Sequence, residues 1–365
     1  MSPGSPATNV FSLRIAERTM PTGSKDPDVL LEWLMDSMCL VRRRSDQGTD
    51  GFGALHRIMR EALLEDPLRG WSSKELGDQT GLSNTGVHHQ MLKLRECGLV
   101  ASKLDGKWHR YVLRGGSISS AIQLVQSEAR AVLGLRMSEL AGFVEPSETR
   151  MEIAPEEPEI PFSISIMENG PKDSLGESAR LVSDLGLAGE GRRVGDSLAE
   201  KIFIELTTSH HPITYLALSE RLSSSRGRVK TVVDRMRSAG IVERAPMLDR
   251  IPQDVYSGLV RQHDARGEEW LLTKGGLGRL DQAVSDALIS GVRKQSMDIE
   301  GVARILSSVS VEDQRTLLNT LGGRMPFGLR VAGEDGSVVA KRVMNLADRA
   351  IRRIGTVAGR LDESI

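Results

Sequence analysis

Residues 71–113 read WSSKELGDQTGLSNTGVHHQMLKLRECGLVASKLDGKWHRYVL, and the order of helix and turn signals in this stretch decides the predicted fold. Ser72 and Glu75 have the spacing of a capping box, which opens a short helix. Gly81 predicts a tight turn after that helix, and Gly98 ends a second, longer helix. Two helices joined by a short turn are typical of a helix-turn-helix, which places its second helix in the major groove of DNA.

The second predicted helix spans residues 84–97 and has an apolar stripe on one side. Its other positions carry side chains that can hydrogen-bond to base edges and phosphates. We expect DNA contacts from Ser83, Asn84, Thr85, His88, His89, Gln90 and Lys93. The two adjacent histidines point in different directions on a helix, so they are poorly arranged to chelate one ion. For each of them, packing in the core is the alternative to DNA contact.

Two strands are predicted after this helix, at residues 99–104 and 108–113, and the turn signal Asp105-Gly106 joins them. A hairpin in this place corresponds to the wing of a winged helix. Basic side chains on a wing meet the phosphate backbone of DNA. The candidates here are Lys103, Lys107 and Arg110.

The combined pattern resembles the ArsR family of winged-helix regulators over residues 53–113. The matching features are the helix exit and the wing, with Glu96, Gly98, Leu99, Val100, Gly106, Trp108 and Tyr111. The resemblance implies DNA binding and a dimer formed by helices that flank the unit. Metal-sensing members carry cysteines in the helix pair, or acidic and histidine ligands in the terminal helix. Residues 117–143 contain neither histidine nor cysteine, so we predict no metal site.

Amphipathic helices are predicted on both sides of this unit, at residues 26–43 and 117–143. Each carries a broad apolar stripe that has to be covered. We expect the two helices to form a homodimer with a second chain. For residues 117–143, packing within the chain's own domain is the alternative.

A second, weaker copy of the motif lies in residues 211–246, HPITYLALSERLSSSRGRVKTVVDRMRSAGIVERAP. Residues 74–100 align with residues 216–242 at a constant shift of 142 positions. Residues 213–245 contain seven basic and three acidic residues, which is the most basic patch on a recognition-type helix of the chain. The expected DNA contacts are Ser225, Arg226, Arg228, Lys230 and Arg235.

The wing of this second unit is expected to be long, with residues 241–244 as its first strand and residues 268–273 as its second. The run WLLTKGGLGRL, residues 270–280, resembles the end of the wing in MarR-type regulators, and the resemblance extends over residues 197–285. Two interpretations of the unit stay open. It binds DNA, or it is a structural or protein-docking module whose basic residues pair with an acidic linker.

We predict a mainly α-helical chain with short β-hairpin wings, built from tandem winged helix-turn-helix domains and flanking helices. Residues 1–25 are rich in Ser, Pro, Gly and Thr, and we expect them to be disordered. Residues 26–143 form the first domain, residues 175–290 the second, and residues 291–365 a C-terminal helical region. Residues 144–174 contain several prolines and an acidic excess, which predicts an exposed linker; a partner-binding or strand-forming segment is the alternative.

The composition limits the classes of function. The net charge is −1, so nucleic-acid binding has to depend on local patches. Two cysteines in 365 residues are too few for a disulfide framework, and no apolar run approaches the ~20 residues of a membrane span. We therefore expect a cytoplasmic protein without membrane contact. The sequence lacks the common metallopeptidase, serine-hydrolase and phosphate-loop motifs, so we predict no enzyme, no catalytic residue and no cofactor.

Together these observations predict a sequence-specific regulator of transcription that binds double-stranded DNA, with the transcription machinery as a further partner. The alternative is a tandem winged-helix assembly factor of transcription, replication or chromosome-segregation machinery. Such a factor binds DNA without sequence preference, or binds protein.

Overall fold

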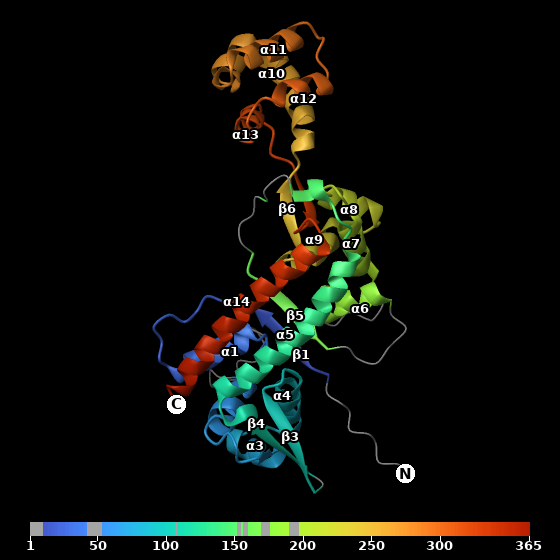
Figure 1. Cartoon of the computed structure of the whole chain (residues 1–365). Coiled ribbons are helices and arrows are strands. Elements are labelled where there is room, and N and C mark those ends of the chain that lie inside the picture. Colours follow the sequence, from blue (N-terminus) through green and yellow to red (C-terminus); the bar gives the residue numbers. More distant parts are fainter. Residues whose placement is uncertain are drawn as a thin grey trace.

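The structure is a computed structural model, which describes residues 10–41, 53–106, 108–151, 155, 160–168, 176–189 and 197–365. Within these residues the chain forms fourteen α-helices and three small antiparallel sheets (Figure 1). The prediction of a mainly α-helical chain with short β elements is confirmed.

The N-terminal unit contains the helix pair that the sequence predicts. Ser72 accepts a hydrogen bond from the Glu75 amide and the Glu75 carboxylate accepts one from the Ser72 amide, so the capping box is present. Ser83 caps the second helix by accepting from the Gly86 amide at 3.2 Å. The elements are α2 (Ala54–Ile58), which continues as a π-helical turn (Met59–Leu63), β2 (Trp71–Ser72), α3 (Ser73–Thr80), α4 (Asn84–Glu96), β3 (Val100–Asp105) and β4 (Trp108–Leu113). The strands form one sheet in the order β2-β4-β3.

The central unit has the same order of elements. Thr214 and Ser225 cap its two helices. Ile213 forms an antiparallel bridge with Leu329, so the order Ile213, β7, β6 repeats the order β2-β4-β3. The elements are α7 (Ser197–Thr208), α8 (Tyr215–Arg221), α9 (Arg226–Ser238), β6 (Val242–Pro246) and β7 (Phe327–Val331).

The shift of 142 positions holds at the residues that define the backbone path of the two units. The helix-capping residues Ser72 and Ser83 correspond to Thr214 and Ser225. The positive φ angles of 67° at Gly81 and 79° at Gly98 recur as 46° at Ser223 and 75° at Gly240. The two units therefore share caps, turns and strand order, although few of the aligned residues are identical.

The predicted wing of the central unit is wrong. β6 pairs with β7, and between these strands lies a helical insert, residues 248–325, with a hydrophobic core of its own. Residues 268–273 are helical, and the MarR-like run falls on the end of a helix and the turn after it. The predicted boundary at residue 290 also lies inside a helix of the insert. Figure 1 shows the insert projecting from one end of the molecule, with α10 (Ile251–Thr273), α11 (Gln282–Arg293), α12 (Ile299–Leu306) and α13 (Val311–Thr320).

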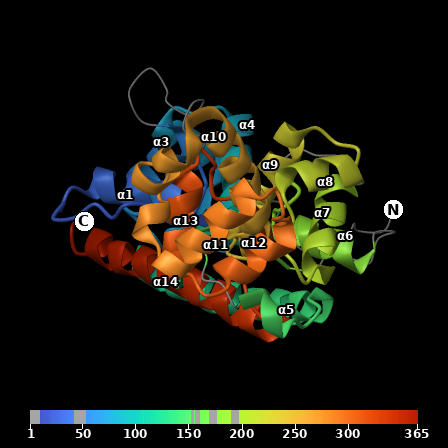
Figure 2. The ribbon, with the colours of Figure 1, turned by 90° about the horizontal axis from the view of Figure 1, so that it is seen from above.

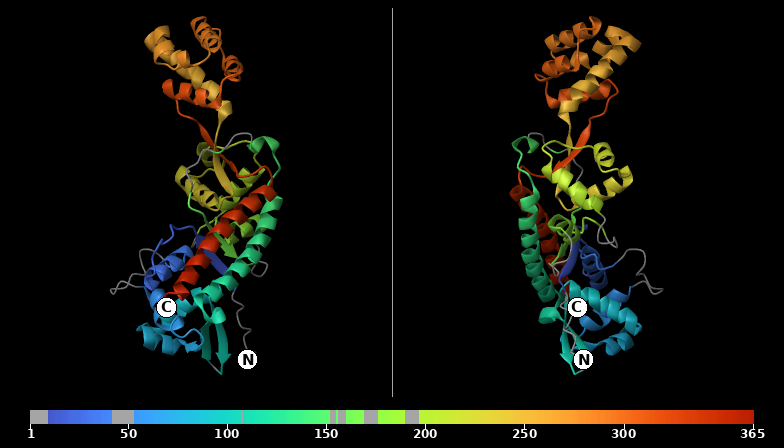
Figure 3. Two further views of the ribbon diagram at one scale, coloured as in Figure 1. Left: turned by 60° about the vertical axis from the view of Figure 1, so that its left-hand side comes forward. Right: turned by 90° about the vertical axis from the view of Figure 1, so that its right-hand side faces the viewer.

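Two long helices join the units. α5 (Ile118–Phe143) follows β4, and α14 (Gly336–Asp362) follows β7. They run antiparallel along one another, since Asp362 hydrogen-bonds to the Ser119 amide at one end and Gly336 lies against Ala141 at the other (Figure 3). α1 (Pro27–Ser37) also packs on α14. Much of the apolar faces that we expected to pair with a second chain is thus covered within this chain, and the predicted homodimer stays a prediction.

A two-stranded ribbon lies between the halves of the molecule. β1 (Ser12–Ala16) pairs antiparallel with β5 (Ser163–Met167). Leu13, Ile15, Ile164 and Ile166 alternate with polar residues, and their side chains are buried. The expectation of disorder is therefore wrong for residues 12–16; residues 1–9 lie outside the described part. The strand-forming alternative is correct for residues 163–167. α6 (Glu177–Asp184) follows this ribbon.

Arg150 fixes the chain between α5 and the central unit. Its side chain is 2% exposed and donates to the carbonyl oxygens of Glu145 (2.8 Å), Ser209 (3.1 Å), Gly333 (3.1 Å) and Glu334 (3.2 Å). Burial, together with the nearby Arg330, lowers the pKa of Arg150. These contacts tie three separate segments to one another, so this part of the predicted linker is an ordered part of the fold.

Candidate nucleic-acid interface

The start of α4 carries most of the predicted contact residues on its surface. Ser83, Asn84, Thr85, His88 and His89 are exposed. Ser83 is the cap of α4, the other four lie in its first two turns, and together they offer hydroxyl, amide and imidazole groups. This is the region of a helix-turn-helix that contacts base edges.

Two predicted contacts of α4 are placed differently. Gln90 is 7% exposed, and its Oε1 atom has no hydrogen-bond partner among the described residues. Lys93 is half-buried, and its Nζ donates to the carbonyl oxygen of Leu40 at 3.4 Å. The prediction of base contact is therefore wrong for Gln90, because it lies three residues after buried Val87 and shares its side of the helix.

The hairpin presents a different surface from the predicted basic wing. Lys103 is exposed, whereas Lys107 lies outside the described residues. Arg110 donates to Glu75 Oε2 at 2.6 Å and to Asp105 Oδ2 at 3.3 Å, so its charge is already paired. Sequence reasoning missed the exposed apolar pair at the tip, Leu104 (64% exposed) and Trp108 (73% exposed). Their places beside the turn could have indicated this exposure.

The start of α9 is basic and exposed. Ser225, Arg226, Arg228 and Lys230 are all exposed. Arg235 is half-buried and donates to the carbonyl oxygen of Ala188 at 3.0 Å, so it belongs to the packing of α9 rather than to the exposed group. Three of the four predicted basic contacts therefore lie together in the first turns of this helix.

The equivalent positions of α4 and α9 carry different chemistry. At the shift of 142, Asn84 corresponds to Arg226 and His88 to Lys230. The exposed start of α4 is rich in neutral hydrogen-bonding groups, whereas that of α9 is cationic. Seen along the long axis of the molecule, α3 and α4 lie on the side away from the α5–α14 pair (Figure 2).

A hollow of about 660 Å³ lies between the far ends of α4 and α9. Its walls include Lys93 and Glu96 of α4 and Ser238 of α9, and Arg14 of the β1–β5 ribbon contributes to its floor. The position of Glu96 in α4 corresponds to that of Ser238 in α9 at the shift of 142. The C-terminal ends of α4 and α9, which correspond in the two units, therefore both line this hollow.

No protein-family model matches the chain, and no curated protein is significantly similar to it in sequence. Among the described residues, no helix combines the length and the apolar character that crossing a membrane requires.

Proposed function

We propose that this chain is a regulator of transcription that binds double-stranded DNA with two winged helix-turn-helix units, one in each half. The observation that carries the proposal is the correspondence of α4 and α9. Both follow a capped first helix and a turn with positive φ, both begin with a serine cap, and both have polar, exposed first turns.

The α5–α14 pair takes the role that we had expected of a second chain. Winged-helix regulators of this kind bind DNA as dimers, which present two recognition helices in a fixed arrangement. Here the two helices belong to one chain, and buried contacts between α5 and α14 hold their units together. The single chain is then the DNA-binding unit.

The different side chains at the starts of α4 and α9 suit two different kinds of DNA contact. Phosphate contacts supply affinity without sequence information, whereas side chains at base edges supply specificity. α9 offers Arg226, Arg228 and Lys230 for the phosphates, and α4 offers Asn84, Thr85, His88 and His89 for base edges.

The test is selection of a preferred duplex from a random pool by the full chain, followed by footprinting. We expect a defined site, and Thr85→Ala/His88→Ala/His89→Ala is expected to lose about 1–3 kcal/mol of binding free energy for each base contact removed. A matched control is Ser307→Ala/Ser308→Ala at two exposed positions that follow α12, far along the chain from α4. Equal binding of all duplexes by wild type would contradict sequence-specific regulation.

That outcome would favour the second candidate, a tandem winged-helix assembly factor. One observation supports it, because the exposed Leu104 and Trp108 at the hairpin tip are apolar and large. Exposed aromatic and apolar side chains are typical of protein contacts. Loss of a protein partner on Leu104→Ser/Trp108→Ser, with DNA binding unchanged, would support this candidate.

A further inference from the structure

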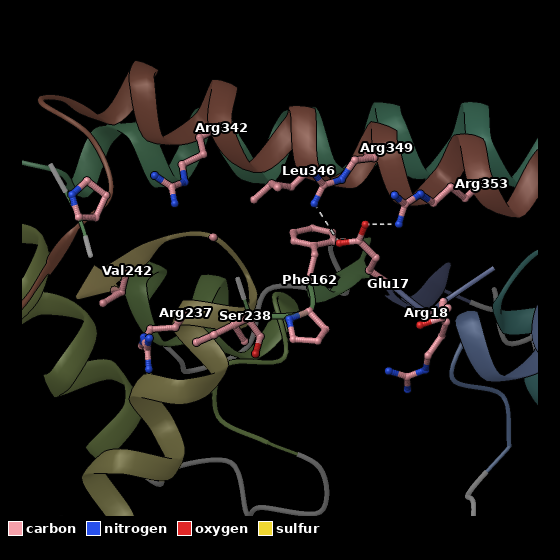
Figure 4. A pocket seen from close by; sticks show the side chains of 15 residues that line it. Glu17, Arg18, Phe162, Arg237, Ser238, Val242, Arg342, Leu346, Arg349 and Arg353 are labelled. Carbon is pink, nitrogen blue, oxygen red and sulfur yellow. Dashed lines mark hydrogen bonds and ion pairs between the residues drawn. The ribbon is translucent and has the colours of Figure 1, made fainter. Parts of the chain in front are cut away.

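An arginine-rich cavity of about 540 Å³ lies beside α14, between this helix and the β1–β5 ribbon (Figure 4). The end of β1, the segment before β5, the α9–β6 turn and α14 all contribute to its walls. The lining residues used below are Glu17, Phe162, Arg342, Leu346, Arg349 and Arg353. The β1–β5 ribbon, the central unit and α14 therefore meet at this cavity.

The cavity has an excess of positive charge. Glu17 accepts hydrogen bonds from Arg349 at 3.0 Å and from Arg353. Glu243, which is fully buried, lies 2.8 Å from Arg342 and 2.8 Å from Arg330. The described residues that line the cavity include five arginines and one carboxylate, that of Glu17, whereas Glu243 and Arg330 do not line it.

The arginines can still reach a ligand. The side chains of Arg342, Arg349 and Arg353 are 40%, 43% and 38% exposed, and Figure 4 shows all three extending from α14 on the side of the cavity. A guanidinium has five donors in a planar fork, so one that holds a carboxylate can also bind a phosphate. Arg349 and Arg353 lie one turn apart on α14 and Arg342 lies two turns before Arg349, so Arg349 and Arg353 form the suitable pair for a dianionic phosphate.

The cavity also has an apolar side, formed by Phe162 and Leu346, whose side chains lie near the arginines in Figure 4. Its volume is within the ~300–1,000 Å³ of small-molecule sites.

We propose that this cavity binds a small phosphorylated ligand that carries a ring, with the phosphate at the arginines of α14 and the ring towards Phe162 and Leu346. The inference goes beyond the proposed function, since binding of such a ligand is measured without DNA.

The probe is a nucleoside 5′-monophosphate, titrated into the full chain by calorimetry, with the matching nucleoside and inorganic phosphate as comparisons. We expect the monophosphate to bind, the nucleoside to bind at least about tenfold more weakly, and binding to weaken as salt is raised. Failure of all four common monophosphates to bind at millimolar concentration would overturn the proposal, and so would equal binding of nucleoside and nucleotide.

Variants locate the site. Arg349→Gln/Arg353→Gln should weaken monophosphate binding by about tenfold or more, because each lost charge-assisted hydrogen bond is a strong one. Arg352→Gln is the matched control, since Arg352 lies between them on α14 but is exposed, does not line the cavity and donates to the Asp348 carbonyl. Equal effects of the two changes would place the ligand elsewhere and overturn the proposal.

A second variant separates binding from damage to the fold. Glu17→Gln removes the negative charge that competes with a phosphate for Arg349 and Arg353. Monophosphate binding should therefore become tighter, by about threefold or more, whereas general damage would weaken it. If duplex DNA displaces the monophosphate and its own binding depends on the same two arginines, the cavity belongs to the DNA interface, and the proposed small-molecule site is wrong.

Discussion

The carboxylate of Asp362 caps a helix that begins 244 residues earlier, at Ile118: its Oδ2 atom accepts a hydrogen bond from the Ser119 amide at 3.0 Å. Oδ1 accepts from the Ile118 amide at 3.2 Å. The last turn of α14 thereby satisfies backbone donors in the first turn of α5, which have no partner within their own helix. This contact lies at one end of the α5–α14 pair and links the C-terminus of the central half to the N-terminal half.

Replacing Asp362 with Ala should lower the free energy of unfolding by about 0.5–2 kcal/mol, the usual effect of losing a capping side chain. Urea unfolding followed by circular dichroism measures the change. Glu363→Ala is the control, because Glu363 is exposed and next in sequence. An equal effect of the two substitutions would show that the cap contributes nothing of its own.

Short sequence patterns predicted those parts of the fold that depend on interactions between residues close together in the chain. The capping pair of Ser72 and Glu75 and the serine caps of α4 and α9 each depend on residues within one helical turn. The pairings of β1 with β5 and of β6 with β7 join segments about 150 and 85 residues apart, and no periodicity contains that information. For the candidate site, the exposed starts of α4 and α9 were predictable, whereas the pairing of Arg110 with Glu75 depends on tertiary contacts.

Arg150→Met should destabilise the chain by more than about 3 kcal/mol, because the carbonyl oxygens of four residues lose the buried donor that they share. Methionine keeps much of the side-chain volume, so loss of packing contributes little to the expected change in stability. Denaturant unfolding is the measurement. Arg304→Met, at an exposed position of α12, is expected to change stability by less than about 0.5 kcal/mol. A small effect at Arg150 would mean that water replaces the guanidinium in this site.

The stability of the chain should fall in mild acid because of His56. Burial lowers the pKa of His56 below 6.5, although Asp28, 3.5 Å away, acts in the opposite direction. The unfolded chain then binds a proton at His56 more readily than the folded chain. The stability that depends on neutral His56 is fully present above pH 6.5. It is lost as the pH falls from there through the lower pKa that His56 has in the folded chain.

Unfolding by urea at a series of pH values between 7.5 and 5 tests this sign, and His56→Gln should remove part of the slope. His211→Gln is the control, because His211 is exposed. A slope that His56→Gln leaves unchanged would assign the pH dependence to other groups.

The DNA site should be asymmetric. A homodimer presents two identical helices and selects a two-fold-symmetric sequence. Here Asn84 and His88 of α4 stand where α9 has Arg226 and Lys230. We expect one half of the selected site to have a defined sequence and the other half to tolerate most sequences. Inverting the defined half should weaken binding by about tenfold or more, whereas inverting the tolerant half should change it little. A palindromic consensus would contradict this expectation.

The basic start of α9 should increase affinity without setting the sequence. Reversing three charges, in Arg226→Glu/Arg228→Glu/Lys230→Glu, removes the phosphate contacts that the second helix is proposed to make. Since one chain holds both helices, the second contact is intramolecular and can raise affinity by up to ~100-fold or more. We expect the variant to lose that gain, to protect a shorter stretch of DNA in footprinting and to show a smaller dependence on salt, while its preference at the defined half stays the same.

The matched control reverses three exposed charges of the helical insert, in Lys274→Glu/Lys294→Glu/Arg304→Glu. An unchanged footprint, with a changed assembly state or a lost protein partner, would show instead that the start of α9 is a docking surface.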